Sequence, residues 1–180
     1  MKNIFFVVFI VFLFSCCDFL EIAPKVDQKH FDIPGFFIEE LKRLNETENP
    51  IIKEISKDEE REDKIIKTPD WQKELAAFID VDINKPALIN SFTVDTIVVS
   101  GDSYEIYYNS IEESSTIRNI SLLYENNSCT FVKIEKNNTN ALFSSKQYMQ
   151  YTKKSGYSIL GELSIRFIYK TNYHVNAKFL

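Results

Sequence analysis

The spacing of hydrophobic residues changes near residue 90 of this 180-residue chain. Before this point apolar residues recur at helical intervals, as Phe37, Leu41 and Leu44 do at positions i, i+4 and i+7. From Ser91 onward apolar and polar residues alternate, which is typical of half-buried β-strands. A run of helices followed by a run of strands predicts an α+β fold.

Two helices are expected ahead of residue 60. The first covers about Pro34 to Leu44, and the second begins at Asn49-Pro50 and carries Ile52 and Ile55. The second leads into eight consecutive charged residues, Lys57 to Lys64. We expect this charged run to be a solvated helix face or a flexible connector. The alternative is a docking surface for a basic partner.

A third helix is expected after Thr68 and Pro69, which suit the cap and the first turn of a helix. It ends near Asp80, because Pro86 disfavours helix in the residues before it. One apolar stripe runs along this helix and consists of Trp71, Leu75, Phe78 and Ile79. The stripe needs an apolar surface to cover, so we expect it to pack against the strands.

About seven antiparallel strands are expected in residues 91–180. Turn residues separate them, and the expected ranges are 91–99, 104–109, 117–125, 129–136, 141–152, 157–170 and 173–179. Gly161 suggests a bend in the longest strand. The predicted fold is therefore α+β, with about three helices within 32–82 packed on one face of a curled sheet within 91–180. Residues 32–180 are expected to form this single domain.

Residues 1–15 have the features of a secretory signal peptide. Lys2 provides a positive start, residues 4–14 form an apolar run, and Ser15 is a small residue at the expected cleavage site. The apolar run is too short for a helix that spans a bilayer core of about 30 Å. Its end, Leu13-Phe14-Ser15-Cys16, resembles the lipobox of bacterial lipoproteins.

The lipobox resemblance implies that Cys16 is the first residue of the mature chain and carries the lipid anchor. Residues 16–31 are then the lipidated cysteine and a tether, which separates the domain from the membrane. The resemblance also implies a cell-envelope location, at the outer membrane. Two or three acyl chains make such attachment effectively permanent, since each buried methylene contributes about 0.8 kcal/mol.

Charge and composition exclude several functions. Acidic residues outnumber basic ones by 26 to 21, and such a surface repels nucleic acid. The two histidines, His30 and His174, have no cysteine near them in a metal-binding spacing, so we expect no metal or other cofactor. Familiar catalytic motifs are absent from the sequence, and we expect no enzyme. Cys129 is expected to be a buried free thiol, and a Cys17–Cys129 disulfide is the alternative.

Further resemblances are weaker. The segment Asp70 to Leu75 with Phe78, followed by Asp82 to Pro86, is similar to one found in uncharacterised lipoproteins of Gram-negative bacteria. The expected layout resembles the half-barrel of lipoprotein carriers and outer-membrane lipoprotein receptors, which hold acyl chains between sheet and helices. Asp95-Thr96-Ile97 is similar to a tripeptide that some Gram-negative lineages glycosylate at the hydroxyl residue. A threonine facing solvent from a strand is the alternative.

Two functions are considered, and the predicted layout favours the first. The first is a ligand-binding module that holds an apolar molecule or acyl chain between helices and sheet. The candidate contact residues for that ligand are Trp71, Phe78, Phe167 and Tyr169. The second is a non-enzymatic structural or interaction lipoprotein, whose core is dry and whose surface docks to a partner in the envelope.

Overall fold

The computed structural model describes residues 29–47 and 49–180. Nine strands form most of it: β1 (Ile51–Lys57), β2 (Glu60–Ile66), β3 (Phe92–Ser100), β4 (Ser103–Ser110), β5 (Ile117–Glu125), β6 (Ser128–Thr139), β7 (Phe143–Thr152), β8 (Gly156–Ile165) and β9 (Tyr169–Phe179). The described helices are α2 (Ile33–Thr47), α3 (Trp71–Glu74) and α4 (Ala76–Ile79). The fold is therefore mostly β.

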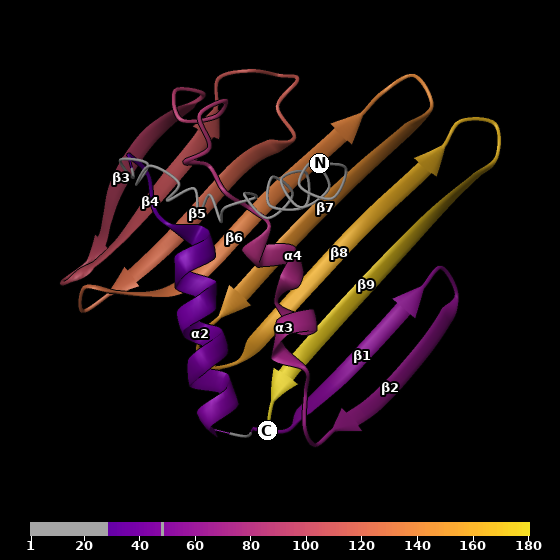
Figure 1. Ribbon diagram of the computed structural model, residues 1–180, viewed down its shortest axis with the longest axis horizontal. Helices are drawn as coiled ribbons and strands as arrows, with labels where there is room; N and C mark the ends of the chain where they lie inside the picture. The colour runs from indigo at the N-terminus through magenta and orange to yellow at the C-terminus, as the bar shows by residue number, and fades with distance from the viewer. Residues whose placement is uncertain (1–28, 48) are drawn as a thin grey trace, which may run out of the picture.

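The nine strands make one antiparallel sheet in the order β2-β1-β9-β8-β7-β6-β5-β4-β3. Strands β3 to β9 follow one another as neighbours, joined by hairpin connections (Figure 1). The hairpin of β1 and β2 is placed beyond β9, where Ile51 pairs with Phe179 and Lys57 with Tyr173. The order begins at β2 and ends at β3, so the sheet is open and has two edges.

The expected α+β fold, with three packed helices and about seven strands, is wrong. The segment predicted as a second helix is β1, and the charged run continues from it into a turn and β2. Ile52 and Ile55 have helical spacing, but Ile51, Lys53 and Ile55 are two residues apart, as side chains on one face of a strand are. Pairing with β2 and β9 favours the extended form. The half-barrel comparison fails with it, because it assumed that layout.

The turn between β1 and β2 has a defined cause. Asp58 adopts a positive φ of 52°, a conformation that aspartate tolerates better than most residues. Its carboxylate accepts hydrogen bonds from Thr171 Oγ1 and from the Asn172 backbone N–H, both at 2.8 Å. Part of the charged run is therefore fixed against β9 and is not a flexible connector.

The helix expected after Thr68 is interrupted. Its helical residues form α3 and α4, which meet at Leu75, and the cap is Asp70, whose side chain accepts a hydrogen bond from the Lys73 N–H. A second difference lies in the last hairpin. The expected turn at residues 171–172 is instead found after Ile165, where Phe167 has a positive φ of 62°.

The hydrophobic core lies between the helices and one face of the sheet. Phe37 of α2, Phe78 of α4 and Tyr151 of β7 are fully buried and contact one another, with Phe37 4.8 Å from Phe78 and 5.2 Å from Tyr151 between ring centroids. Tyr157 of β8 packs against Phe78 at 6.1 Å. The rings of the helices and those of the strands therefore fill the space between α2, α4 and the sheet.

Candidate functional site

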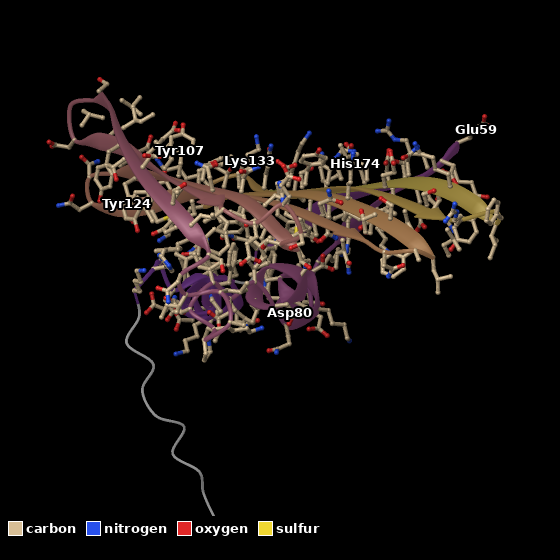
Figure 2. The ribbon with its side chains drawn as sticks, turned by 90° about the horizontal axis from the view of Figure 1, so that it is seen from above. Glu59, Asp80, Tyr107, Tyr124, Lys133 and His174 are labelled. Atoms are coloured by element: carbon tan, nitrogen blue, oxygen red, sulfur yellow. The ribbon has the colours of Figure 1, made fainter. Side chains whose placement is uncertain are left out.

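Helices cover one face of the sheet and leave the other face uncovered in the described part of the chain (Figure 2). All described helices lie against one face, which we call the covered face, whereas Tyr107, Lys133 and His174 project from the opposite face (Figure 2). We call the opposite side the open face. Because side chains alternate along a strand, each strand contributes to both faces.

Two of the four residues expected to contact a ligand lie in the core of the covered face. Trp71 is 2 % exposed and its ring packs edge-on against Phe179 of β9, with centroids 5.8 Å apart. Phe78 is fully buried among Phe37, Tyr151 and Tyr157. Their surroundings are protein rings, so both side chains fill the layer.

The other two, Phe167 and Tyr169, are not brought together with them. Phe167 lies in the β8–β9 turn and is 95 % exposed, and Tyr169 opens β9 and is 48 % exposed. Trp71 packs near the opposite end of β9, at Phe179. At about 3.3 Å per residue, the two ends of this strand are about 33 Å apart. The four residues therefore do not share one site.

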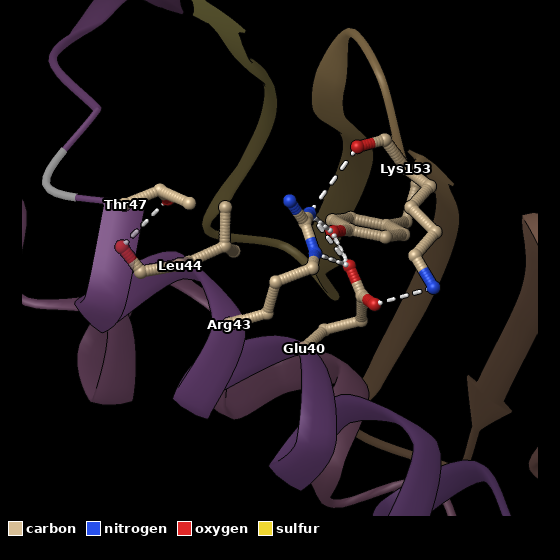
Figure 3. A network of polar contacts seen from close by, with 6 residues as sticks. Glu40, Arg43, Leu44, Thr47 and Lys153 are labelled. Carbon is tan, nitrogen blue, oxygen red and sulfur yellow. Dashed lines mark hydrogen bonds and ion pairs between the residues drawn. The ribbon is translucent and has the colours of Figure 1, made fainter.

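A charged network joins α2 to the end of β7 (Figure 3). One oxygen of the buried Glu40 carboxylate accepts hydrogen bonds from Arg43 Nη2 at 2.7 Å and from the Tyr151 hydroxyl at 2.6 Å. Its other oxygen forms an ion pair with Lys153 Nζ at 3.0 Å. Arg43 Nη2 also donates to the Lys153 backbone carbonyl at 3.2 Å.

The electrostatics of this network are those of a stabilising ion pair. Burial alone raises the pKa of Glu40, but hydrogen bonds from Arg43, Tyr151 and Lys153 outweigh it, so the pKa is below its ordinary value. Burial and the Glu40 carboxylate raise the pKa of the Tyr151 hydroxyl. Because the network links α2 to Tyr151 and Lys153, we assign it to holding α2 on the sheet.

Two further networks attach other parts of the chain to the covered face. Lys53 Nζ of β1 contacts both oxygens of Glu74 on α3, at 2.9 and 2.7 Å, and the Tyr157 hydroxyl also donates to Glu74. The backbone N–H of buried His30 donates to Asn84 Oδ1 at 2.9 Å. These contacts fix α3 and the start of the described chain.

One nucleophile–base pair lies on the open face. Ser158 Oγ and His174 Nε2 are 3.0 Å apart on the neighbouring strands β8 and β9. A catalytic pair needs a third group that orients the histidine. Among the described residues no carboxylate forms a hydrogen bond with His174. The pair also lies on a partly exposed sheet face outside the helix layer, so the geometry gives it no catalytic assignment.

The large side chains of the open face were not identified from the sequence as a group. Tyr148 of β7 stands opposite Leu160 of β8, and they are 38 % and 48 % exposed. Tyr107, Leu123 and Phe131 lie on the same face and are partly exposed. Alternation along each predicted strand gives two sets of residues, but only the position of the helices shows which set is uncovered.

Open hollows occur at strand turns. One of about 500 Å³ lies where the β3–β4 and β5–β6 turns meet, and its lining includes Gly101, Tyr104, Asn126 and Asn127. Trp71 and Phe78 do not line it. Its walls are largely polar turn residues, which do not suit an acyl chain.

The predicted anchor and one disulfide partner lie outside the described residues. Cys16 and the rest of the lipobox belong to this part, as does Cys17. Cys129 is buried with a free thiol, and burial raises its pKa to about 12. In the described chain, no helix is both long and apolar enough to cross a membrane, and no cluster of residues suits a metal ion.

Comparisons with known proteins give no family assignment: no family model, curated protein or solved structure matches this chain. Its function must therefore be argued from its own residues.

Proposed function

We propose that this chain is a lipid-anchored protein of the cell envelope that binds a protein partner through its sheet and has no enzymatic role. The observation that carries the proposal is the contrast between the covered face, filled by buried rings, and the open face, which the described helices leave uncovered. The proposed anchor is Cys16 at the outer membrane, and it rests on the lipobox resemblance.

The size of the open face supports this role. Nine strands at about 4.8 Å spacing extend about 38 Å, and a ten-residue strand extends about 30 Å. This area is on the order of 1,000 Å², and a stable interface needs about 800 Å² from each partner. Tyrosines among polar residues, such as Tyr107 and Tyr148, are suited to interfaces because they combine an apolar ring with a hydroxyl.

The packing of the covered face weighs against the apolar-ligand module. Phe37, Phe78, Tyr151 and Tyr157 occupy the space between helices and sheet where an acyl chain was expected. A ligand there must displace buried rings into solvent, which forfeits about 1.5–3 kcal/mol of burial for each ring. The open face can meet a partner without this cost.

The test uses the full chain in its own envelope. A photoreactive phenylalanine analogue replaces Tyr148 on the open face, and in a matched control it replaces Ile38, which is 44 % exposed on α2. We expect a discrete cross-linked protein product from position 148 and none from position 38. Equal products at both positions, or none at either, would reject the open face as the interface.

Two companion measurements test the rest of the proposal. The variant Cys16→Ser should lose fatty-acid labelling, and retained labelling would reject the anchor. Purified protein is also titrated with a fluorescent fatty acid, and we expect no saturable binding. Saturable binding would instead support the apolar-ligand module.

A further inference from the structure

The two edges of the sheet have opposite chemical character. Strand β2 presents five consecutive charged and exposed residues, Glu60 to Lys64. Charged side chains protect an edge strand against pairing with other chains. Strand β3 is equally exposed after Phe92 but is dominated by β-branched residues, and Asp95 is its single charged residue. It contains neither lysine nor proline, so its edge lacks this protection.

Among the described residues, no strand pairs with the outer side of β3. The Ile111 N–H donates to the Ser91 carbonyl at 2.9 Å, which makes these opposed residues a hydrogen-bonded pair. Hydrogen-bonded positions alternate along an antiparallel ladder. Thr93, Asp95 and Ile97 therefore bond to β4, and the N–H and C=O groups of the residues between them point away from it. The residues whose backbone N–H and C=O groups point outward are Val94, Thr96 and Val98.

The charges near this edge indicate the kind of strand that fits. Residues 86–117 contain no lysine or arginine and carry five acidic residues, which are Asp95, Asp102, Glu105, Glu112 and Glu113. Two cations from outside this range lie beyond the strand ends: Lys29 Nζ donates to Asn90 Oδ1 at 3.0 Å, and Arg118 Nη1 donates to the Glu112 carbonyl at 2.8 Å. Tyr108 of β4 is buried on the covered face, so Tyr107 and Glu105, which are one and three residues from it, lie on the open face. Asp95 of β3 pairs with Tyr107 and therefore lies on the open face as well. A second copy of the chain would bring the same acidic edge against this one. A basic strand would complement it.

We infer that β3 binds an extended, basic segment of a partner protein, which adds to the sheet as a tenth strand. Residues of that segment on the open-face side are lysine or arginine and pair with Asp95 and Glu105. Residues on the other side are β-branched and pack beside Val94, Thr96 and Val98. The inference rests on the proposed interaction role and assigns it a binding edge and a partner chemistry.

The experiment measures peptide binding to the purified full chain. The probe is a fluorescent nine-residue peptide, the length of β3, in which valine or threonine alternates with lysine. A control peptide has glutamate at every lysine position. We expect saturable binding of the lysine peptide that weakens with added salt. The affinity for the glutamate peptide should be lower by at least about tenfold.

A matched pair of proline variants tests the edge itself. Thr96→Pro removes an outward N–H of β3 and leaves the hydrogen bonds to β4 in place. Asp63→Pro does the same on β2, where the two-residue turn between Lys57 and Glu60 makes the Asp63 N–H point outward. Thr96→Pro should weaken lysine-peptide binding about tenfold, a loss of about 1.4 kcal/mol. Asp63→Pro should leave it unchanged.

The outcomes separate this inference from the proposed function. If Thr96→Pro does not fold, Asp95→Lys replaces it, because it reverses the charge that should pair with the lysines of the peptide. Equal binding of both peptides, or full binding by the folded edge variant, overturns the inference. Self-association that Thr96→Pro abolishes would instead assign the edge to a second copy. A cross-link at position 148 without peptide binding leaves the proposed function standing.

Discussion

Tyr148 and Tyr151 are three residues apart on β7 and have opposite environments. Tyr151 is fully buried on the covered face, where its hydroxyl donates to Glu40. Tyr148 is 38 % exposed on the open face. The same residue type on the same strand therefore stabilises the fold in one case and is available to a partner in the other. The difference depends on which face the helices cover.

This comparison separates stability from recognition. Buried rings and paired charged side chains lie on the covered face, and substitutions there are expected to lower the free energy of unfolding. Side chains of the open face contribute less to that free energy, so they can vary with the needs of a partner. Matched substitutions on the two faces should differ accordingly.

The largest effect is expected for Phe78→Ala on the covered face. Removing a fully buried ring should lower the free energy of unfolding by about 3–5 kcal/mol. Tyr148→Ala is the open-face control and should lose less than about 1 kcal/mol, the range of a cross-strand pair with Leu160. Urea denaturation measures both. Equal losses would show that the open face is also part of the stabilising core.

A smaller loss is expected for Glu40→Gln. The amide keeps the volume but no longer offers a charged acceptor to Arg43, Tyr151 and Lys153. Hydrogen bonds to charged groups contribute about 1.5–3 kcal/mol, and we expect a loss of about 2–3 kcal/mol. Glu39→Gln changes the neighbouring exposed carboxylate and should have an effect within about 0.5 kcal/mol. Similar values for both variants would contradict a stabilising network.

The same carboxylate should make stability depend on pH. The pKa of Glu40 is lowered in the folded protein from an ordinary value of 4.5. A lowered pKa means that the stabilisation is present above pH 4.5 and is lost as the pH falls through the folded value. The difference in unfolding free energy between wild type and Glu40→Gln should therefore be constant near neutral pH and shrink below pH 4.5. A difference that stays constant in acid would contradict the assignment.

Sequence patterns located several structural features. Strands β3 to β9 fall within the region of alternating residues, and the apolar stripe of Trp71 and Phe78 is buried against the sheet. Local patterns failed where pairing decided the structure. Ile52 and Ile55 suit a helix by spacing alone, but pairing with β2 and with β9, which is more than a hundred residues away, makes this segment a strand.

The candidate surfaces were harder to predict. The charged run was assigned to a solvated segment, but its role as the protected edge of a sheet depends on its position beyond β9. The exposure of Phe167 also follows from tertiary structure. The β8–β9 turn comes earlier than the Thr171-Asn172 pair suggested, so Phe167 lies in the turn and not within a strand.

The smallest effect on stability is expected at Phe167. Its side chain is 95 % exposed, and its positive φ of 62° is unfavourable for a bulky residue. Asparagine tolerates this conformation, so Phe167→Asn relieves backbone strain but loses the contact with the Arg166 guanidinium, 5.1 Å from the ring centroid. An exposed cation–π contact contributes about 0.5–1 kcal/mol, similar in size to the strain relieved. The two effects should nearly cancel, leaving a change within about 0.5 kcal/mol in urea denaturation. A loss above about 2 kcal/mol would show that the ring packs against the protein.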